Sequence, residues 1–105
     1  MIRTILTAAA LAATIATQAQ ASVFKDKFID SMMECMSYSS KMNCDKAEGA
    51  AELYARSLRN NPAAEQCALT AQVAGGQASI IPLVPSAVST AQAYLEQVMS
   101  ECAGF

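Results

Sequence analysis

The residues of this chain with the most distinctive chemistry are its four cysteines, Cys35, Cys44, Cys67 and Cys102. An even number of cysteines in a short exported chain predicts disulfide bonds rather than free thiols, and the N-terminal residues described below predict export. Four cysteines allow three connectivities, and their spacing alone does not choose among them. A choice therefore depends on the fold.

Methionines surround the first two cysteines and offer a second kind of chemistry. Together they form a cluster of soft ligands that suits Cu(I): Met32, Met33, Met36, Met42, Cys35 and Cys44. However, Met32 and Met36 fall at helical spacing on or beside an apolar stripe, where methionine fills gaps in a core. An oxidising compartment also removes the thiolates. We therefore expect core packing and no metal or other cofactor, and copper binding remains a second alternative.

Several catalytic arrangements are excluded by composition. The chain has no histidine, which excludes Ser-His-Asp and Cys-His catalysis and histidine metal sites. Glu34 and Glu65 could in principle be a carboxylate pair, but no pattern places them together in a cleft. Gly75-Gly76 lacks the surroundings of a phosphate-binding loop. We therefore expect that the protein is not an enzyme.

The N-terminus has the pattern of a cleavable signal peptide. A short basic start with Arg3 precedes an uncharged run, Ile5 to Ala16, and a small-residue cleavage site, Ala19-Gln20-Ala21. The run is too short to span a bilayer, which takes about 20 residues. We predict a signal peptide over residues 1–21 and a single helical domain over 22–105. The mature protein would be periplasmic or secreted, most simply in a bacterium.

The mature chain would carry six basic and nine acidic residues, a net charge of −3. Nucleic-acid binding is not expected, because it needs a basic face.

Apolar residues recur at steps of three and four and predict four amphipathic helices. The chain has no alternating run typical of a strand. The four expected apolar stripes are Phe24, Phe28, Met32 and Cys35; Cys44, Ala47, Ala51, Tyr54 and Leu58; Ala63, Cys67, Thr70 and Ala74; and Val88, Ala91, Leu95, Val98 and Cys102.

Polar and helix-breaking residues predict where these helices end. Ser37 to Asn43 is expected to be the first turn, with Asn43 or Asp45 as the next N-cap and Asp45 and Glu48 as a capping box. Asn61 and Pro62 should begin the third helix. Gly75-Gly76 should end it, and Ser86 should cap the last.

Four helices with short connections predict an all-α, up-down four-helix bundle stapled by two disulfides. In such a bundle Cys35 and Cys44 lie at one end, and Cys67 and Cys102 at the other. Both other connectivities would need a bond from end to end, beyond the reach of about 7 Å between Cα atoms. The fold therefore favours Cys35–Cys44 and Cys67–Cys102, and a less regular arrangement of helices would reopen the choice.

One long segment has no charge. Thirteen charged residues lie between Lys25 and Glu65, but none lies between Gln66 and Leu95. A covered central position or a contact surface would each explain this. If it is a contact surface, the expected interface residues lie in the apolar connection 77–85: Ile80, Ile81, Leu83 and Val84.

We therefore expect a protein that acts by protein–protein interaction, such as an accessory component of secretion or conjugation machinery, or an immunity or inhibitor protein. The first alternative is a membrane-active or cell-killing protein that contacts a bilayer through 77–85.

Overall fold

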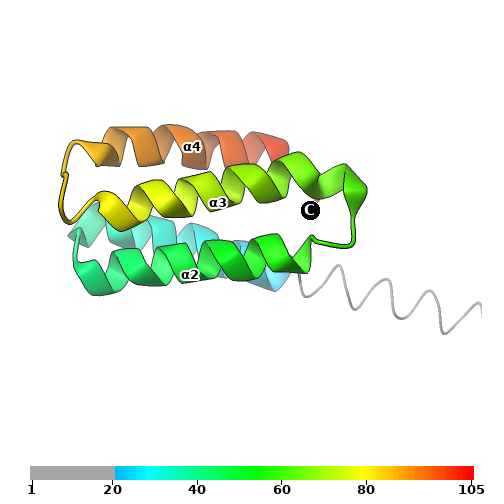
Figure 1. The fold of residues 1–105 in the computed structure, drawn as a ribbon, viewed down its shortest axis with the longest axis horizontal. Coiled ribbons are helices and arrows are strands. Elements are labelled where there is room, and N and C mark those ends of the chain that lie inside the picture. The colour runs from blue at the N-terminus through cyan, green and yellow to red at the C-terminus, as the bar shows by residue number, and fades with distance from the viewer. Residues whose placement is uncertain (1–20) are drawn as a thin grey trace, which may run out of the picture.

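The computed structural model describes residues 21–105, which form an up-down bundle of four helices (Figure 1). Residues 21–38 form the N-terminal helix, and α2 (Lys41–Ser57), α3 (Glu65–Ile80) and α4 (Ala87–Glu101) follow. A short 3₁₀ helix, η1 (Pro62–Ala64), leads into α3. The predicted fold class is confirmed. The predicted signal peptide lies outside the described residues, apart from Ala21.

Each helix packs against two neighbours. In Figure 1, α3 lies between α2 and α4, and the N-terminal helix lies behind them. The rings of Phe28 and Tyr54 stack with centroids 6.1 Å apart and join the N-terminal helix to α2. The Lys25 ammonium donates a hydrogen bond of 2.9 Å to the Cys102 carbonyl at the end of α4, where the helix dipole favours a cation.

The predicted apolar stripes form most of the core. Its largest fully buried side chains are Phe28, Met32, Tyr54, Ile81 and Val98. Four predicted positions differ: Ala63 is exposed, and Phe24, Val88 and Leu95 are only partly buried. The last three pack against the core, and part of each side chain stays accessible to solvent.

The first connection is shorter than predicted. The N-terminal helix continues through residue 38, and α2 begins at Lys41, so only Ser39 and Ser40 connect them. Ser39 takes a left-handed conformation (φ 53°), and Ser40 is the N-cap, accepting a bond from the Asn43 N–H at 3.1 Å. The prediction of Asn43 or Asp45 as the cap was wrong, and so was the Asp45–Glu48 capping box. Asp45 instead pairs with Lys41 at 2.6 Å.

The start of the third helix was predicted correctly, and its end was not. Asn61 caps the Ala63 N–H, and Pro62 begins the first turn. However, α3 continues through Gly75-Gly76 to Ile80. Gly75 packs directly against α2, because a Cβ built there would lie 2.5 Å from the Ala51 Cβ. This glycine therefore allows two helices to approach closely and does not end one.

The two disulfides have the predicted pairing. Cys35–Cys44 joins the N-terminal helix to α2 with Cα atoms 4.6 Å apart, and Cys67–Cys102 joins α3 to α4 at 4.9 Å. They close opposite ends of the bundle. No free cysteine remains among residues 21–105.

Candidate interaction surface

The side chains with catalytic or metal-binding potential are not gathered in one place. Glu34 and Glu65 are exposed on different helices at opposite ends of the bundle. Of the methionines in the predicted soft cluster, Met32 is fully buried, while Met33 and Met42 are more than half exposed. Cys35 and Cys44 are bonded to each other. Within residues 21–105, no three His, Cys, Asp or Glu side chains come close enough to hold a metal ion.

The four predicted interface residues divide between the core and the surface. Ile81 is fully buried and therefore belongs to the core of the bundle and not to its exposed surface. Ile80, Leu83 and Val84 are 39%, 84% and 47% exposed. The reason is local: α3 extends to Ile80, and Ile81 still has a helical conformation that turns its side chain inward. We call the exposed residues Ile80, Leu83 and Val84 the apolar tip.

A row of exposed apolar residues continues from the tip along α3. Leu69, Val73, Gly76 and Ile80 follow one another at steps of four, three and four, so they share one face of the helix. All four are exposed. We call them the α3 row. The sequence contained this signal, but the buried stripe of the same helix and the expected stop at Gly75-Gly76 concealed it.

The surface of α4 beside the α3 row is polar but uncharged along most of its length. Ser89, Thr90, Ala93, Tyr94 and Gln97 line an open groove there. At one end of this surface, Glu101 accepts hydrogen bonds from Gln97 at 3.0 Å and from the buried Thr70 hydroxyl. These two donors hold the pKa of the Glu101 carboxyl below its ordinary value.

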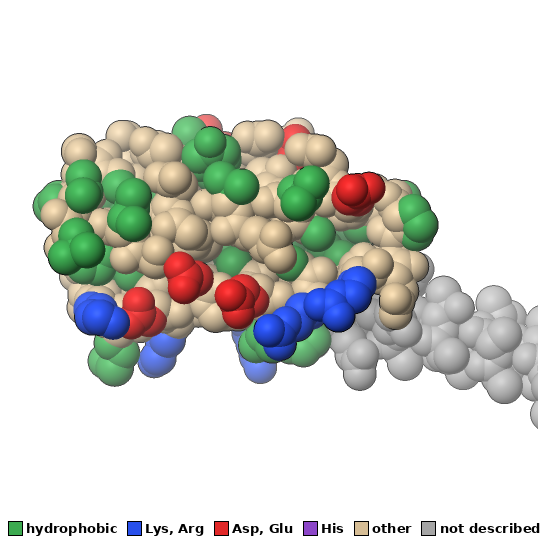
Figure 2. Space-filling view, viewed as in Figure 1, with side chains coloured by type: hydrophobic (Ala, Val, Ile, Leu, Met, Phe, Trp, Pro, Cys, Tyr) green, Lys and Arg blue, Asp and Glu red, His purple; other side chains and the backbone are tan. Residues whose placement is uncertain are grey.

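Charges lie on the other side of the α3 row. Figure 2 shows acidic and basic side chains along α2, with hydrophobic side chains gathered toward the end of the bundle where α3 turns into α4. Glu48 and Glu52 line a shallow pocket with Gln72 and Gly76. The uncharged surface therefore has a charged border along α2.

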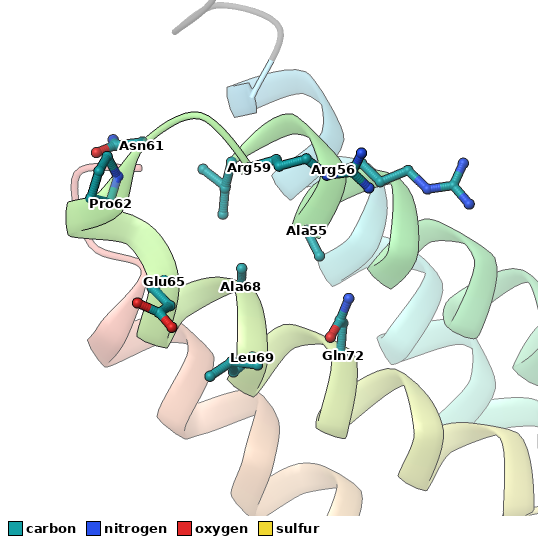
Figure 3. A pocket seen from close by; sticks show the side chains of 10 residues that line it. Ala55, Arg56, Arg59, Asn61, Pro62, Glu65, Ala68, Leu69 and Gln72 are labelled. Atoms are coloured by element: carbon teal, nitrogen blue, oxygen red, sulfur yellow. The ribbon is translucent and has the colours of Figure 1, made fainter.

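A second pocket lies at the opposite end of the α2–α3 seam and has a volume of about 360 Å³. Figure 3 shows Arg56 and Arg59 on its α2 side and Glu65, Leu69 and Gln72 on its α3 side. The pocket is open and has charges of both signs. Leu69 lines this pocket and is also the residue of the α3 row closest to the start of α3.

A separate apolar groove of about 520 Å³ runs between the N-terminal helix and α4. Its wall includes Met33 and Met36 of the N-terminal helix, which the sequence placed in the core or in a copper site, and Met99 of α4. The apolar residues of this groove are Ile29, Met33, Met36, Val88, Leu95 and Met99. It lies on the far side of α4 from the α3 row.

None of the helices within residues 21–105 has the length and apolar character needed to span a bilayer. Comparison with protein families, with curated proteins and with solved structures finds no match for this chain.

Proposed function

We propose that this protein is exported and acts by binding another protein through the apolar tip. The observation that carries the proposal is the exposure of Leu83, which is 84% accessible to solvent although the tip is apolar throughout. An exposed apolar patch next to an uncharged surface is typical of a site for protein or membrane contact. A role as an accessory component of secretion or conjugation machinery, or as an immunity or inhibitor protein, is consistent with such a surface.

The two disulfides support this proposal, because each fixes one end of the bundle, and the Cys35 sulfur of the bond at the end of the tip lies 3.4 Å from the Ala78 carbonyl oxygen of α3. A preformed surface loses little conformational entropy on binding. The same disulfides are compatible with an oxidising compartment outside the cytoplasm. The predicted signal peptide would deliver the chain there.

The test is affinity purification of the tagged protein from the cell envelope, comparing wild type with Leu83→Asp. We expect Leu83→Asp to keep the melting temperature and to lose a specific partner, because the charge would be placed at the centre of the contact. Ile81→Asp is the matched contrast, since it buries a charge and should unfold the protein. A partner set that Leu83→Asp leaves unchanged would contradict the proposal.

The membrane-active alternative predicts a different result in the same comparison. Purified protein alone would release dye from vesicles of phosphatidylethanolamine and phosphatidylglycerol, and Leu83→Asp would abolish this. We expect no release. Release that requires no partner would replace protein binding by membrane contact as the function of the tip.

A further inference from the structure

We propose that the α3 row and the adjoining surface of α4 bind a second copy of this chain, forming a two-fold symmetric dimer. The inference rests on the proposed function only in treating exposed apolar surface as contact surface. The dimer has a different partner from the one proposed above, and it is centred on different residues.

The distribution of charge favours this surface as the place where two copies meet. With nine acidic and six basic residues over 22–105, two copies repel each other at most orientations. A two-fold interface brings the same patch of both copies together, so a patch of one sign would face itself. The α3 row and Thr90, Ala93, Tyr94 and Gln97 carry no charge. Glu48 and Glu52 of α2 lie beside Gly76, so the two copies must meet over the α3 row and α4, with α2 outside the contact, to avoid placing like charges together.

The open position of Gly76 also favours contact with a second copy. A glycine inside an exposed helix lowers helix stability relative to alanine, and the bundle itself does not require one here, because a Cβ at Gly76 would meet nothing within 4 Å. Gly49 is equally open, but three of the four residues one turn away from it are charged: Asp45, Lys46 and Glu52. The corresponding neighbours of Gly76 are uncharged, and Val73 and Ile80 are among them. Gly76 is thus a gap within an apolar row.

The α3 row is also complementary to itself. If two copies of α3 cross antiparallel, with the two-fold axis midway between Val73 and Gly76, residues equally far from the axis face each other. Val73 then packs over Gly76 of the second copy, and Leu69 meets Ile80 of the second copy. Each large side chain faces a gap or another apolar side chain, as in knobs-into-holes packing. On α4 the same axis brings Tyr94 close to Gln97 of the second copy, where the phenol and the amide can hydrogen-bond.

The size of this surface predicts a reversible dimer. The 16 residues of α3 extend about 24 Å, and two adjacent helices are about 20 Å wide, which gives a footprint of about 500 Å² per copy. A standard stable interface takes about 800 Å² per partner. We therefore expect a dissociation constant in the range of about 1–100 μM, and dimers at the higher concentrations reached in solution experiments.

The first test is sedimentation equilibrium of the oxidised protein from about 1 to 500 μM, a range that brackets this constant, comparing wild type with Gly76→Leu. Leucine fills the gap and blocks Val73 of the second copy, but it is a better helix former than glycine, and its Cβ has nothing within 4 Å in its own bundle. We expect Gly76→Leu to be monomeric and to melt at the same or a higher temperature. A monomeric wild type, or a Gly76→Leu variant that dimerises as wild type does, would overturn the dimer.

The second test examines the register by mixing two variants. Leu69→Lys and Ile80→Glu should each be monomeric, but their mixture should form a heterodimer, because the lysine of one copy faces the glutamate of the other. Leu69→Lys mixed with Val73→Glu is the matched control, in which the charges do not face each other and no heterodimer is expected. Native mass spectrometry distinguishes the species. Equal recovery in both mixtures would overturn the register.

The dimer and the proposed function fail separately. A monomeric wild type that still loses its partner on Leu83→Asp would contradict the dimer alone. A dimer that Gly76→Leu abolishes, in a protein for which Leu83→Asp changes no partner, would contradict the proposed function alone.

Discussion

Among residues 21–105, Tyr54 is the largest side chain that is fully buried, and it is also the buried side chain that can ionise. Its ring stacks on Phe28. Its hydroxyl lies 3.4 Å from the Cys67 sulfur, and because a disulfide sulfur carries no proton, the tyrosine is the donor. Burial raises the pKa of Tyr54 to about 12, since a phenolate in this apolar site would lose its hydration.

This raised pKa predicts a loss of stability at alkaline pH. Below pH 10 the phenol is protonated in the folded and unfolded states, so it adds no pH dependence. Between pH 10 and about 12 only the unfolded state releases its proton, so the free energy of unfolding should fall with rising pH, by about 2–3 kcal/mol in total. Urea unfolding at each pH measures this.

Two variants decide whether Tyr54 causes that loss. Tyr54→Phe should show a flatter dependence above pH 10 than wild type. Tyr38→Phe, which removes an exposed phenol, should keep the wild-type dependence. The same slope for Tyr54→Phe and wild type would contradict the assignment.

At this scale the sequence predicted which residues are buried where a helix is long and regular, and it failed at a helix end. The stripe from Cys44 to Leu58 is buried at every predicted position. The sequence did not distinguish the exposed Ile80 from the buried Ile81. Two adjacent residues of equal hydropathy are distinguished only by the phase of the helix. That phase was lost once the helix was expected to end at Gly75-Gly76.

At the scale of elements, the close packing of α2 and α3 depends on small side chains. The buried residues of α3 are mainly Ala, Gly, Cys and Thr, and Gly75 lies where its helix approaches Ala47, Glu48 and Ala51 of α2. Neither the Ala51 Cβ nor the Glu48 Cα, 3.3 Å from the added atom, is the end of a flexible side chain. A methyl group on residue 75 must therefore push the helices apart.

We expect Gly75→Ala to lower the free energy of unfolding by up to about 2 kcal/mol, because the overpacking costs about 1–3 kcal/mol and the gain in helix propensity offsets only about 1 kcal/mol of it. Gly49→Ala is the matched control. It lies in α2 with nothing within 4 Å of the added carbon, so only the propensity gain of up to about 1 kcal/mol remains. Chemical denaturation measures both. If the two substitutions shift stability in the same direction, α2 and α3 do not pack as closely as described.

The boundaries of the elements were the least predictable part of the fold. The polar segment from Ser37 to Asn43 looked like a turn, but only Ser39 and Ser40 leave helical conformation. Serine and asparagine are weak helix formers that tolerate helix interiors when tertiary contacts hold them there. Here the Cys35–Cys44 bond holds both sides of the connection. The pattern therefore indicated the position of the turn and overestimated its length.

At the scale of the whole molecule, the disulfide pairing followed from topology. An up-down order places Cys35 beside Cys44 and Cys67 beside Cys102, and the bonds occur there. The contact surface did not follow in the same way, because a missing charge is compatible with a covered helix and with an exposed one. The structure shows that one face of α3 is covered and the opposite face is exposed.

The same topology predicts that the two disulfides contribute unequally to stability. Cys35 and Cys44 are separated by 9 positions, and Cys67 and Cys102 by 35. By loop-closure entropy the shorter loop stabilises by about 3 kcal/mol and the longer loop by about 4 kcal/mol. Opening the longer loop also loosens the sulfur that accepts the Tyr54 hydrogen bond. Both effects act in the same direction.

We therefore expect Cys67→Ala/Cys102→Ala to lose at least about 1 kcal/mol more free energy of unfolding than Cys35→Ala/Cys44→Ala. All four cysteines are buried to a similar degree, so the change in side-chain volume affects the two pairs alike and leaves loop length as the main difference. Denaturation under oxidising conditions gives the two values. Under reducing conditions wild type should become less stable than either double variant measured oxidised, because it loses both bonds. A larger loss from opening Cys35–Cys44 would show that local strain or residual structure in the unfolded chain outweighs loop length.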